Sequence, residues 1–274
     1  ASTSASVKLS KDATISILTC SPGNELYSLF GHTGIRVVDK ANDMDIVFNY
    51  GTFDFATQGF YFKFARGLLP YQLSCSEFHR FLSSYIHDER SVYSQTLNLD
   101  SIQKQYLMDL LVENYEPANR EYLYNFLYDN CSTRVRDIIE KSTGNQITWI
   151  AQPSTKSFWN LLDEYLGRSP WIQWGIHTIL GSPATSTATI HEQMFLPDYL
   201  MYHLDSAAYN GAPLVQPIET VYEVPEQDLS TPWYFSPFFV FAICTLALIL
   251  LLQKAKSRRL LKAIAIPFFI ATGV

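Results

Sequence analysis

Hydrophobic and polar residues alternate in four short stretches of the first half of the chain. The stretches "ATISILTC", "HTGIRVV", "DIVFNYGTFDF" and "SVYSQTLNL" begin at residues 13, 32, 45 and 91, and they are rich in β-branched and aromatic residues. A period of two in such residues is typical of half-buried β-strands. We therefore predict four strands that form a small antiparallel sheet, with turns such as "DKANDM" between them.

Two other stretches have apolar residues at the three- and four-residue spacing of a helix. Residues 74–90 place five of them on one stripe, namely Phe78, Phe81, Leu82, Tyr85 and Ile86. Asp100 can cap a second helix over 101–115, since an Asp side chain accepts the first free N–H groups. Residues 120–128 fit an extended and a helical chain equally well. The mixture of strands and helices predicts an α+β fold for the first half of the chain.

The segment "YDNCSTRVRDII" (residues 128–139) predicts a helix that begins at a cysteine. Asp129 or Asn130 can cap it, and an apolar stripe follows at Val135, Ile138 and Ile139. Cys131 then lies in the first turn, where the helix dipole and the free N–H groups favour an anion. Such a position lowers the pKa of a thiol, and its N–H groups can stabilise an oxyanion. The alternative is a structural cysteine, either small and buried or half of a disulfide.

The composition changes after Gly144. Residues 145–234 form an aromatic-rich helical extension that contains all five tryptophans of the chain. Tryptophan is enriched at membrane–water interfaces, and ordinary core packing is the alternative. The uncharged run 235–252 is long enough to cross a bilayer as a helix. A basic loop at 253–262 and a shorter apolar run at 263–274 follow, and we interpret the latter as the truncated start of a second membrane helix.

The charge distribution predicts an orientation. Five of the 20 basic residues lie just after the first apolar run, so the positive-inside rule places that loop in the cytoplasm and the preceding chain outside it. The remaining 15 basic residues stand against 26 acidic ones, and a domain with a formal charge of −11 is unsuited to nucleic acid phosphates. The first residues, "ASTSAS", resemble a mature N-terminus after signal-peptide removal, or a tag remnant. We therefore expect an inner-membrane protein with a periplasmic N-terminal domain and no nucleic acid partner.

Three cysteines precede the apolar run, in a compartment where disulfides persist, and Cys244 lies within the run. Because three is an odd number, one pair leaves one free thiol. Cys20 and Cys75 have no activating feature nearby, so we predict a disulfide between them and a free thiol at Cys131. An unpaired thiol in an oxidising compartment favours a catalytic role.

A thiol nucleophile needs a base, and the chain has six histidines. His32 begins a predicted strand directly after Gly31. A histidine at a strand start that faces a cysteine at a helix start is the arrangement of papain-like thiol enzymes. We interpret the other five histidines as surface or packing residues. No two His or Cys residues have the spacing of metal ligands, so we expect neither a metal nor a cofactor.

Three motifs in order carry a family resemblance: "LTCSPGNELYSLFGHTGIRVVD", "FNYGTFDF" and "NFLYDNCSTRVRD", with "MFLPDYLM" downstream. They resemble the N-terminal extracytoplasmic domain of the Bacteroidetes lipoprotein N-acyltransferases (Lnb). That family is similar to the circularly permuted papain-like thiol enzymes, which include lecithin:retinol acyltransferase. The resemblance implies a permuted papain-like core over residues 1–144, with Cys131 as the nucleophile and His32 as the base. It also implies several membrane helices after this domain.

The implied activity is the N-acylation of a lipoprotein. The Cys131 thiolate would take a fatty acyl chain from a phospholipid or another lipid ester, and the N-terminal amine of a diacylated lipoprotein would accept it. Asn49 or Asp54 would orient His32, with ordinary edge-strand or turn polarity as the alternative for both. Asn130 would support the site or its oxyanion. Two other functions stay open, a papain-like thiol hydrolase of the cell envelope (an amidase or peptidase) and a non-catalytic membrane module.

Overall fold

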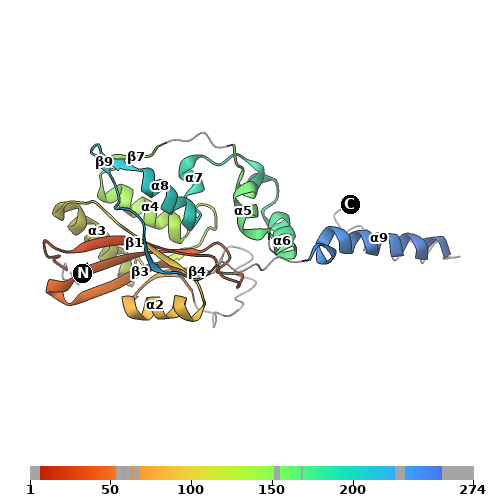
Figure 1. The fold of residues 1–274 in the computed structure, drawn as a ribbon, viewed down its shortest axis with the longest axis horizontal. Coiled ribbons are helices and arrows are strands. Elements are labelled where there is room, and N and C mark those ends of the chain that lie inside the picture. Colours follow the sequence, from red (N-terminus) through yellow and green to blue (C-terminus); the bar gives the residue numbers. More distant parts are fainter. Residues whose placement is uncertain are drawn as a thin grey trace. The chain divides into compact units, whose positions relative to one another are not determined.

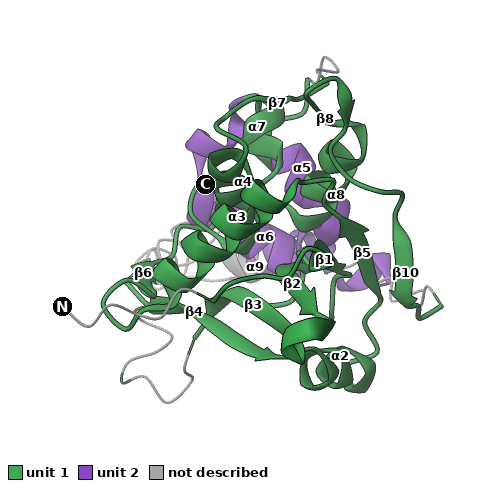
Figure 2. Cartoon of the chain, turned by 90° about the vertical axis from the view of Figure 1, so that its left-hand side faces the viewer, with its two compact units in different colours: residues 1–158, 187–226 green, residues 159–186, 227–274 purple. Residues whose placement is uncertain are grey.

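The computed structural model describes residues 7–53, 58, 63, 68–150, 155–167, 169–225 and 232–254 (Figure 1). The chain divides into two compact units, which Figure 2 shows in green and purple. The first unit comprises residues 1–158 and 187–226, and the second comprises residues 159–186 and 227–274. Each unit therefore contains two segments that are distant in the sequence.

The first unit is built on a seven-stranded antiparallel sheet with the strand order β10-β5-β1-β2-β3-β4-β6. Its strands are β1 (Thr14–Cys20), β2 (His32–Asp39), β3 (Met44–Thr52), β4 (Pro70–Glu77), β5 (Val92–Thr96), β6 (Glu121–Leu123) and β10 (Glu219–Tyr222). A smaller sheet pairs β7 (Ile147–Thr148), β8 (Ala208–Tyr209) and β9 (Ala212–Pro213). The consecutive strands β1 to β4 are also neighbours in the large sheet, so its centre is a meander.

Helices cover both faces of the large sheet (Figure 1). The helices of the first unit are α2 (Phe78–His87), α3 (Ser101–Tyr115), α4 (Cys131–Ser142), α7 (Ile190–Gln193) and α8 (Pro197–Ser206), with the 3-10 turn η1 (Lys40–Asn42). Helices α3, α4 and α8 lie on one face, and α2 lies on the other. Because α4 packs against β2 and β3, its first turn can meet residues of these two strands.

The two faces of β1 explain why this strand is buried almost throughout. Ile15 and Ile17 belong to the main core together with residues of α3, α4 and α8. Leu18 and Cys20 belong to a second core on the side of α2, where they pack with Phe81. Neighbouring side chains of a strand point to opposite faces, so a strand that is covered on both sides needs apolar residues at both parities.

The four predicted strands are present as β1, β2, β3 and β5. Asp100 caps α3 through a capping box, as its position predicts. The predicted helix over 74–90 begins later than expected, because residues 74–77 belong to β4 and pair with β3. Ile86 is exposed rather than part of the buried stripe. The segment 120–128, which the periodicity left open, contains the edge strand β6.

The sheet is larger than the sequence predicts because distant segments join it. Strand β6 pairs with β4 at one edge, and β10 pairs with β5 at the other. Helix α8 packs on β1. Residues 187–226, which the sequence groups with the aromatic extension, therefore complete the first unit.

The second unit consists of helices and aromatic contacts. Its elements are α5 (Phe158–Leu166), whose first residue belongs to the first unit, α6 (Pro170–Leu180), η2 (Ser182–Thr185), η3 (Trp233–Phe235) and α9 (Pro237–Lys254). The indole N–H of Trp171 donates to the carbonyl oxygen of Phe235 at 2.7 Å. The ring of Phe241 lies 5.6 Å from Trp171 and 5.4 Å from Trp174, so aromatic packing joins α6 to α9.

Helix α9 coincides with the apolar run for which the sequence predicts a membrane span. Within the described residues, no helix reaches the length and apolar character that crossing a membrane requires. The transmembrane helix predicted over 235–252 stays a prediction. The helix begins at Pro237, after the start of the run, and its end at Lys254 lies in the basic segment. The remainder of the predicted loop over 253–262 and the run 263–274 lie outside the described residues.

Candidate active site

Helix α4 begins at Cys131 because Asn130 caps it. The side-chain oxygen of Asn130 accepts the N–H groups of Ser132 at 2.9 Å and of Thr133 at 3.0 Å. In return, the Thr133 hydroxyl accepts the N–H of Asn130 at 2.8 Å, which completes a capping box. Cys131 therefore lies in the first helical turn, as the sequence predicts.

The carboxamide of Asn130 is fully used within the fold. Its amino group donates to the carbonyl oxygens of Phe126 and Phe195, each at 2.8 Å. Asn130 is also almost completely buried. It supports the site by anchoring the start of α4 to the segment before α8, and it has no donor left for a substrate oxyanion. Asp129, the alternative cap, instead forms a two-point ion pair with Arg134.

Cys131 faces the start of β2. The ring of His32, the N–H of Thr33 and the hydroxyl of Ser132 all favour the thiolate of Cys131 and lower the pKa of its thiol. The hydroxyl oxygens of Ser132 and Thr33 are themselves 2.9 Å apart, which holds the first turn of α4 against β2. A thiol in this place is surrounded by donors, and donors stabilise a thiolate.

Strands β2 and β3 separate where His32 and Asn49 lie. Their ladder ends at the pair Ile35–Phe48, although β2 begins at His32 and β3 continues to Thr52. Beyond this pair, Nε2 of His32 lies 3.3 Å from Oδ1 of Asn49. Because the carboxamide oxygen only accepts, Nε2 carries the proton in this bond. The other ring nitrogen, Nδ1, is then the atom available to the thiol of Cys131.

Two glycines allow the backbone to come close to this site. Gly31, with φ of +81°, precedes His32 directly, and a Cβ there would lie only 2.7 Å from the carbonyl oxygen of Cys20. Gly51, with φ of +86°, lies where β3 gains one residue relative to β4. A Cβ at Gly51 would lie 3.5 Å from the Cβ of Cys131. Both positions require the left-handed backbone that glycine adopts without strain.

The pKa of the Cys131 thiol is lower than its ordinary value. Burial opposes this by penalising the charged thiolate, but the charge and the hydrogen bond of His32, with two further donors, outweigh it. The other thiols of the first unit behave in the opposite way. Burial raises the pKa of Cys20 to about 12 and that of Cys75 to about 11. Of these three thiols, Cys131 ionises most readily.

The structure contradicts the predicted disulfide between Cys20 and Cys75. All four cysteines of the chain, each within the described residues, are free. Cys20 ends β1 and Cys75 lies in β4, so that two strands separate them. Three steps of about 4.8 Å place β1 and β4 roughly 14 Å apart. A disulfide requires Cα atoms within about 7 Å.

Three of the sequence-predicted site residues meet, namely Cys131 from α4, His32 from β2 and Asn49 from β3. Asn130 lies beside them as the helix cap. Asp54, the other residue predicted to orient His32, lies outside the described residues. Because each of the three comes from a different element, only the packing of α4 on the sheet brings them together.

Sequence reasoning missed a group of tyrosines beside Cys131. Tyr71 of β4 stacks on Tyr124 with ring centroids 4.2 Å apart, and Tyr122 of β6 lies 6.4 Å from Tyr71. Burial raises the pKa of each of these phenols, and the negative charge of Cys131 raises it further. The three phenols are therefore neutral near the thiol. The alternation in "EYLY" was the available signal, since Tyr122 and Tyr124 share one face of an extended chain.

The family described as the Lnb N-terminal periplasmic domain matches residues 4–163. The chain belongs to this family. No curated protein and no solved structure matches it. Cys131, His32 and Asn49 all lie within the matched residues, so the site is part of the Lnb domain, and this domain is extracytoplasmic.

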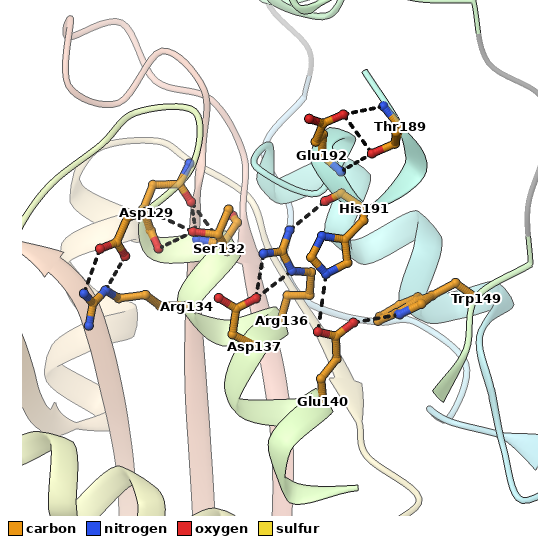
Figure 3. A network of polar contacts seen from close by, with 12 residues as sticks. Asp129, Ser132, Arg134, Arg136, Asp137, Glu140, Trp149, Thr189, His191 and Glu192 are labelled. Atoms are coloured by element: carbon orange, nitrogen blue, oxygen red, sulfur yellow. Dashed lines mark hydrogen bonds and ion pairs between the residues drawn. The ribbon is translucent and has the colours of Figure 1, made fainter. Parts of the chain in front are cut away.

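A polar network lies between α4 and α7 (Figure 3). The guanidinium of Arg136 donates to the carboxylate of Asp137 and, at 2.6 Å, to the carbonyl oxygen of His191. Glu140 accepts the indole N–H of Trp149 at 2.9 Å, and its carboxylate lies 3.3 Å from Nε2 of His191. The network joins α4 to α7 and so helps to fix the helix that carries Cys131.

Asp137, Glu140 and His191 bring their possible ligand atoms within 4.8 Å of one another, as a metal site would. The guanidinium of Arg136 already neutralises Asp137, and Trp149 occupies one oxygen of Glu140. A cation there would be repelled by Arg136. These residues therefore form a structural clasp. Burial alone would raise the pKa of Glu140. The hydrogen bonds from His191 and Trp149 and the nearby positive charge outweigh burial, so the pKa of Glu140 is lowered.

Proposed function

We propose that the Lnb domain transfers a fatty acyl chain from a lipid ester to the N-terminal amine of a lipoprotein, through a thioester on Cys131. The observation that carries the proposal is the position of His32 between Asn49 and a thiol of lowered pKa. A cysteine at a helix start, served by a histidine and an asparagine, is the constellation of papain-like thiol enzymes. It supports a permuted papain-like core for the first unit.

In the first half-reaction, Cys131 is a thiolate and His32 holds the proton taken from it. The sulfur attacks the carbonyl carbon of the ester, and a C–S bond forms. The C–O bond to the glycerol then breaks, and His32 protonates the leaving oxygen. Asn49 keeps the imidazole in the orientation that both proton transfers need. The products are an acyl thioester and a lysolipid.

In the second half-reaction, the amine of the lipoprotein attacks the thioester carbonyl. His32, now neutral, takes the amine proton while the N–C bond forms. The C–S bond breaks, and the thiolate of Cys131 returns beside a protonated His32. The rings of Tyr71 and Tyr124, which stack on each other near the thiol, would favour this outcome by limiting the access of water to the thioester.

A lipid surface is the partner that we propose for the second unit. Trp233 and Phe238 are 71% and 84% exposed, and α9 also exposes Ile243 and Leu246. Several large exposed apolar side chains in one segment favour an interaction site, and tryptophan favours the membrane–water interface. Flotation with phosphatidylethanolamine vesicles tests the placement. The full chain should float, and a Trp233→Ala/Phe238→Ala variant should float less; equal flotation would remove the proposal.

Intact mass measurement tests the acyl transfer. After incubation with dioleoylphosphatidylethanolamine, the wild-type chain should gain one oleoyl group, whereas Cys131→Ala should gain none. A synthetic peptide with an N-terminal diacylglyceryl cysteine should then take the oleoyl group, and the same peptide with an acetylated amine should not. Release of free oleate in place of peptide acylation would favour a thiol hydrolase. An unmodified wild-type chain would contradict both enzymatic functions.

A further inference from the structure

The first turn of α4 leaves one backbone donor free at the site. Asn130 accepts the N–H groups of Ser132 and Thr133, and the N–H of Arg134 bonds to the carbonyl oxygen of Asn130. Among the described contacts, the N–H of Cys131 itself has no acceptor. The oxyanion that forms on the ester's carbonyl oxygen when the sulfur of Cys131 attacks can use this donor, but such intermediates commonly need more than one.

Tyr122 has a buried polar atom that lacks a partner. Its hydroxyl oxygen is buried and, among the described residues, forms no hydrogen bond of ordinary geometry, although the backbone N–H of Gly51 lies close enough to lower its pKa. An unpaired buried hydroxyl costs about 1–3 kcal/mol, which suggests that a ligand satisfies it. The hydroxyl borders the same small space as the nucleophile. A Cβ placed at Gly51 would lie 3.9 Å from it and 3.5 Å from the Cβ of Cys131.

The ring of Tyr122 is held firmly in this position. The guanidinium carbon of Arg134 lies 3.5 Å from its ring centroid, and Arg134 is itself fixed by its ion pair with Asp129. Tyr122 also pairs with Tyr71 in the ladder between β6 and β4. A donor that is fixed before the reaction stabilises a developing charge without reorganisation.

The phenol is suited to donating. Burial raises its pKa, and the negative charge of Cys131 raises it further, so the group keeps its proton through the physiological range. A phenol that stays protonated beside a thiolate can offer a hydrogen bond to an oxyanion and cannot compete with His32 as a base.

We propose that Tyr122 is a further catalytic residue, whose hydroxyl donates to the oxyanion formed when Cys131 attacks an ester. The inference rests on the proposed function. As the C–S bond forms, the π electrons of the carbonyl move onto its oxygen, and the hydroxyl of Tyr122 and the N–H of Cys131 donate to that oxygen. When the carbonyl forms again, the C–O bond to the alcohol breaks, and the leaving oxygen takes its proton from His32.

The variant Tyr122→Phe removes the hydroxyl and keeps the ring that Arg134 stacks upon. Tyr50→Phe is the matched control, because Tyr50 is a buried phenol whose hydroxyl accepts a bond from Asn114 at 2.7 Å and therefore has a partner. Single-turnover acylation of the full chain by dioleoylphosphatidylethanolamine should fall about 10²- to 10³-fold in Tyr122→Phe. It should stay near the wild-type rate in Tyr50→Phe. The dependence of Cys131 alkylation by iodoacetamide on pH should be the same in all three proteins.

A Tyr122→Phe rate within about twofold of the wild type would overturn the inference. An equal loss of the acylation rate and of the alkylation rate in Tyr122→Phe would also overturn it, since the hydroxyl would then act on the thiolate or on the fold. The activated ester p-nitrophenyl butyrate separates this inference from the proposed function, because its acylation of Cys131 needs the same oxyanion and no lipid recognition. If the nitrophenyl ester reacts in a Tyr122-dependent way and the phospholipid does not, lipid transfer fails and the role of Tyr122 stands. If Cys131 accepts neither acyl group, both are overturned.

Discussion

The Nε2 atom of His32 lies 3.3 Å from Oδ1 of Asn49, between two strands whose ladder has already ended. No backbone pairing of β2 with β3 therefore fixes His32 at this point. The carboxamide takes over this role, because it holds the proton on Nε2 and leaves Nδ1 for the thiol. The orientation of the proposed base thus depends on one side chain.

Removing this contact should slow the acylation of Cys131. In Asn49→Ala, the ring of His32 loses its partner, and a misplacement of about 1 Å can cost about 10²-fold in rate. Asn49→Asp keeps an acceptor and should retain more of the rate than Asn49→Ala. Asn114→Ala is the control, since this asparagine bonds to Tyr50 and does not contact His32. Single-turnover lysolipid release measures the effect, and an Asn49→Ala rate within twofold of wild type would exclude the orienting role.

Cys131 should react with iodoacetamide at lower pH than an ordinary thiol, because its pKa is lowered. The thiolate fraction rises with pH through the pKa, so the rate should reach half of its maximum at a lower pH than the rate of an ordinary thiol. In His32→Ala the midpoint should move upward, since the charge and hydrogen bond that favour the thiolate are lost and burial remains. Cys20 and Cys75, whose pKa values are about 12 and 11, should stay unlabelled at pH 7. An unchanged midpoint in His32→Ala would show that the two residues do not act together.

Cys20 and Cys75 should both be recovered as free thiols. Their strands are separated by β2 and β3, so no bridge can form without unfolding the sheet. Alkylation in denaturant without a reducing agent, followed by peptide mapping, should label both cysteines completely. A peptide pair linked through these two residues would disprove the strand order of the sheet.

Gly51→Ala should affect both stability and acylation. The left-handed backbone at φ of +86° strains an alanine by about 1–2 kcal/mol, and the added methyl group would lie 3.5 Å from the Cβ of Cys131. Gly211→Ala is a matched control, because Gly211 has φ of +78° and no atom within 4 Å of its added Cβ. Urea unfolding should show a similar loss in both variants, whereas acylation should fall only in Gly51→Ala. Equal acylation in the two variants would mean that Gly51 matters only to the fold.

The clasp on α4 should stabilise the protein only while Glu140 is ionised. The pKa of Glu140 is lowered in the folded state, so its contribution is full above the unfolded value of about 4.3 and is lost as the pH falls through the folded value. Since the pair with His191 is partly exposed, we expect Glu140→Gln to lose about 1 kcal/mol at pH 7.

Urea unfolding of wild type and Glu140→Gln at pH 7 and at pH 3 measures this contribution. The difference between the two proteins should shrink toward zero at pH 3. Glu113→Gln, a change at an exposed position of α3, should leave stability unchanged at both values. A difference for Glu140→Gln that persists at pH 3 would assign the loss to packing rather than to charge.

Local patterns in the sequence determined a substantial part of this structure. The period of two in "ATISILTC" and "HTGIRVV" identified β1 and β2, because an alternation of residue types is visible within a few residues. The possible caps Asp129 and Asn130 and the stripe at Val135, Ile138 and Ile139 identified the start and the buried face of α4 for the same reason, and the structure chose Asn130 as the cap. The position of Cys131 in a first helical turn followed directly, as did His32 at a strand start.

Only the tertiary structure decided which of these residues meet. The order of the strands separates Cys20 from Cys75, and the early end of the β2–β3 ladder brings Asn49 to His32. The edge strand β6 places Tyr122 near Cys131, although the segment 120–128 had no decisive period. These relationships join residues that are distant in the sequence, and they depend on strand order and on the packing of α4. A local pattern records whether a side chain is buried, but it does not record which distant side chain it will contact.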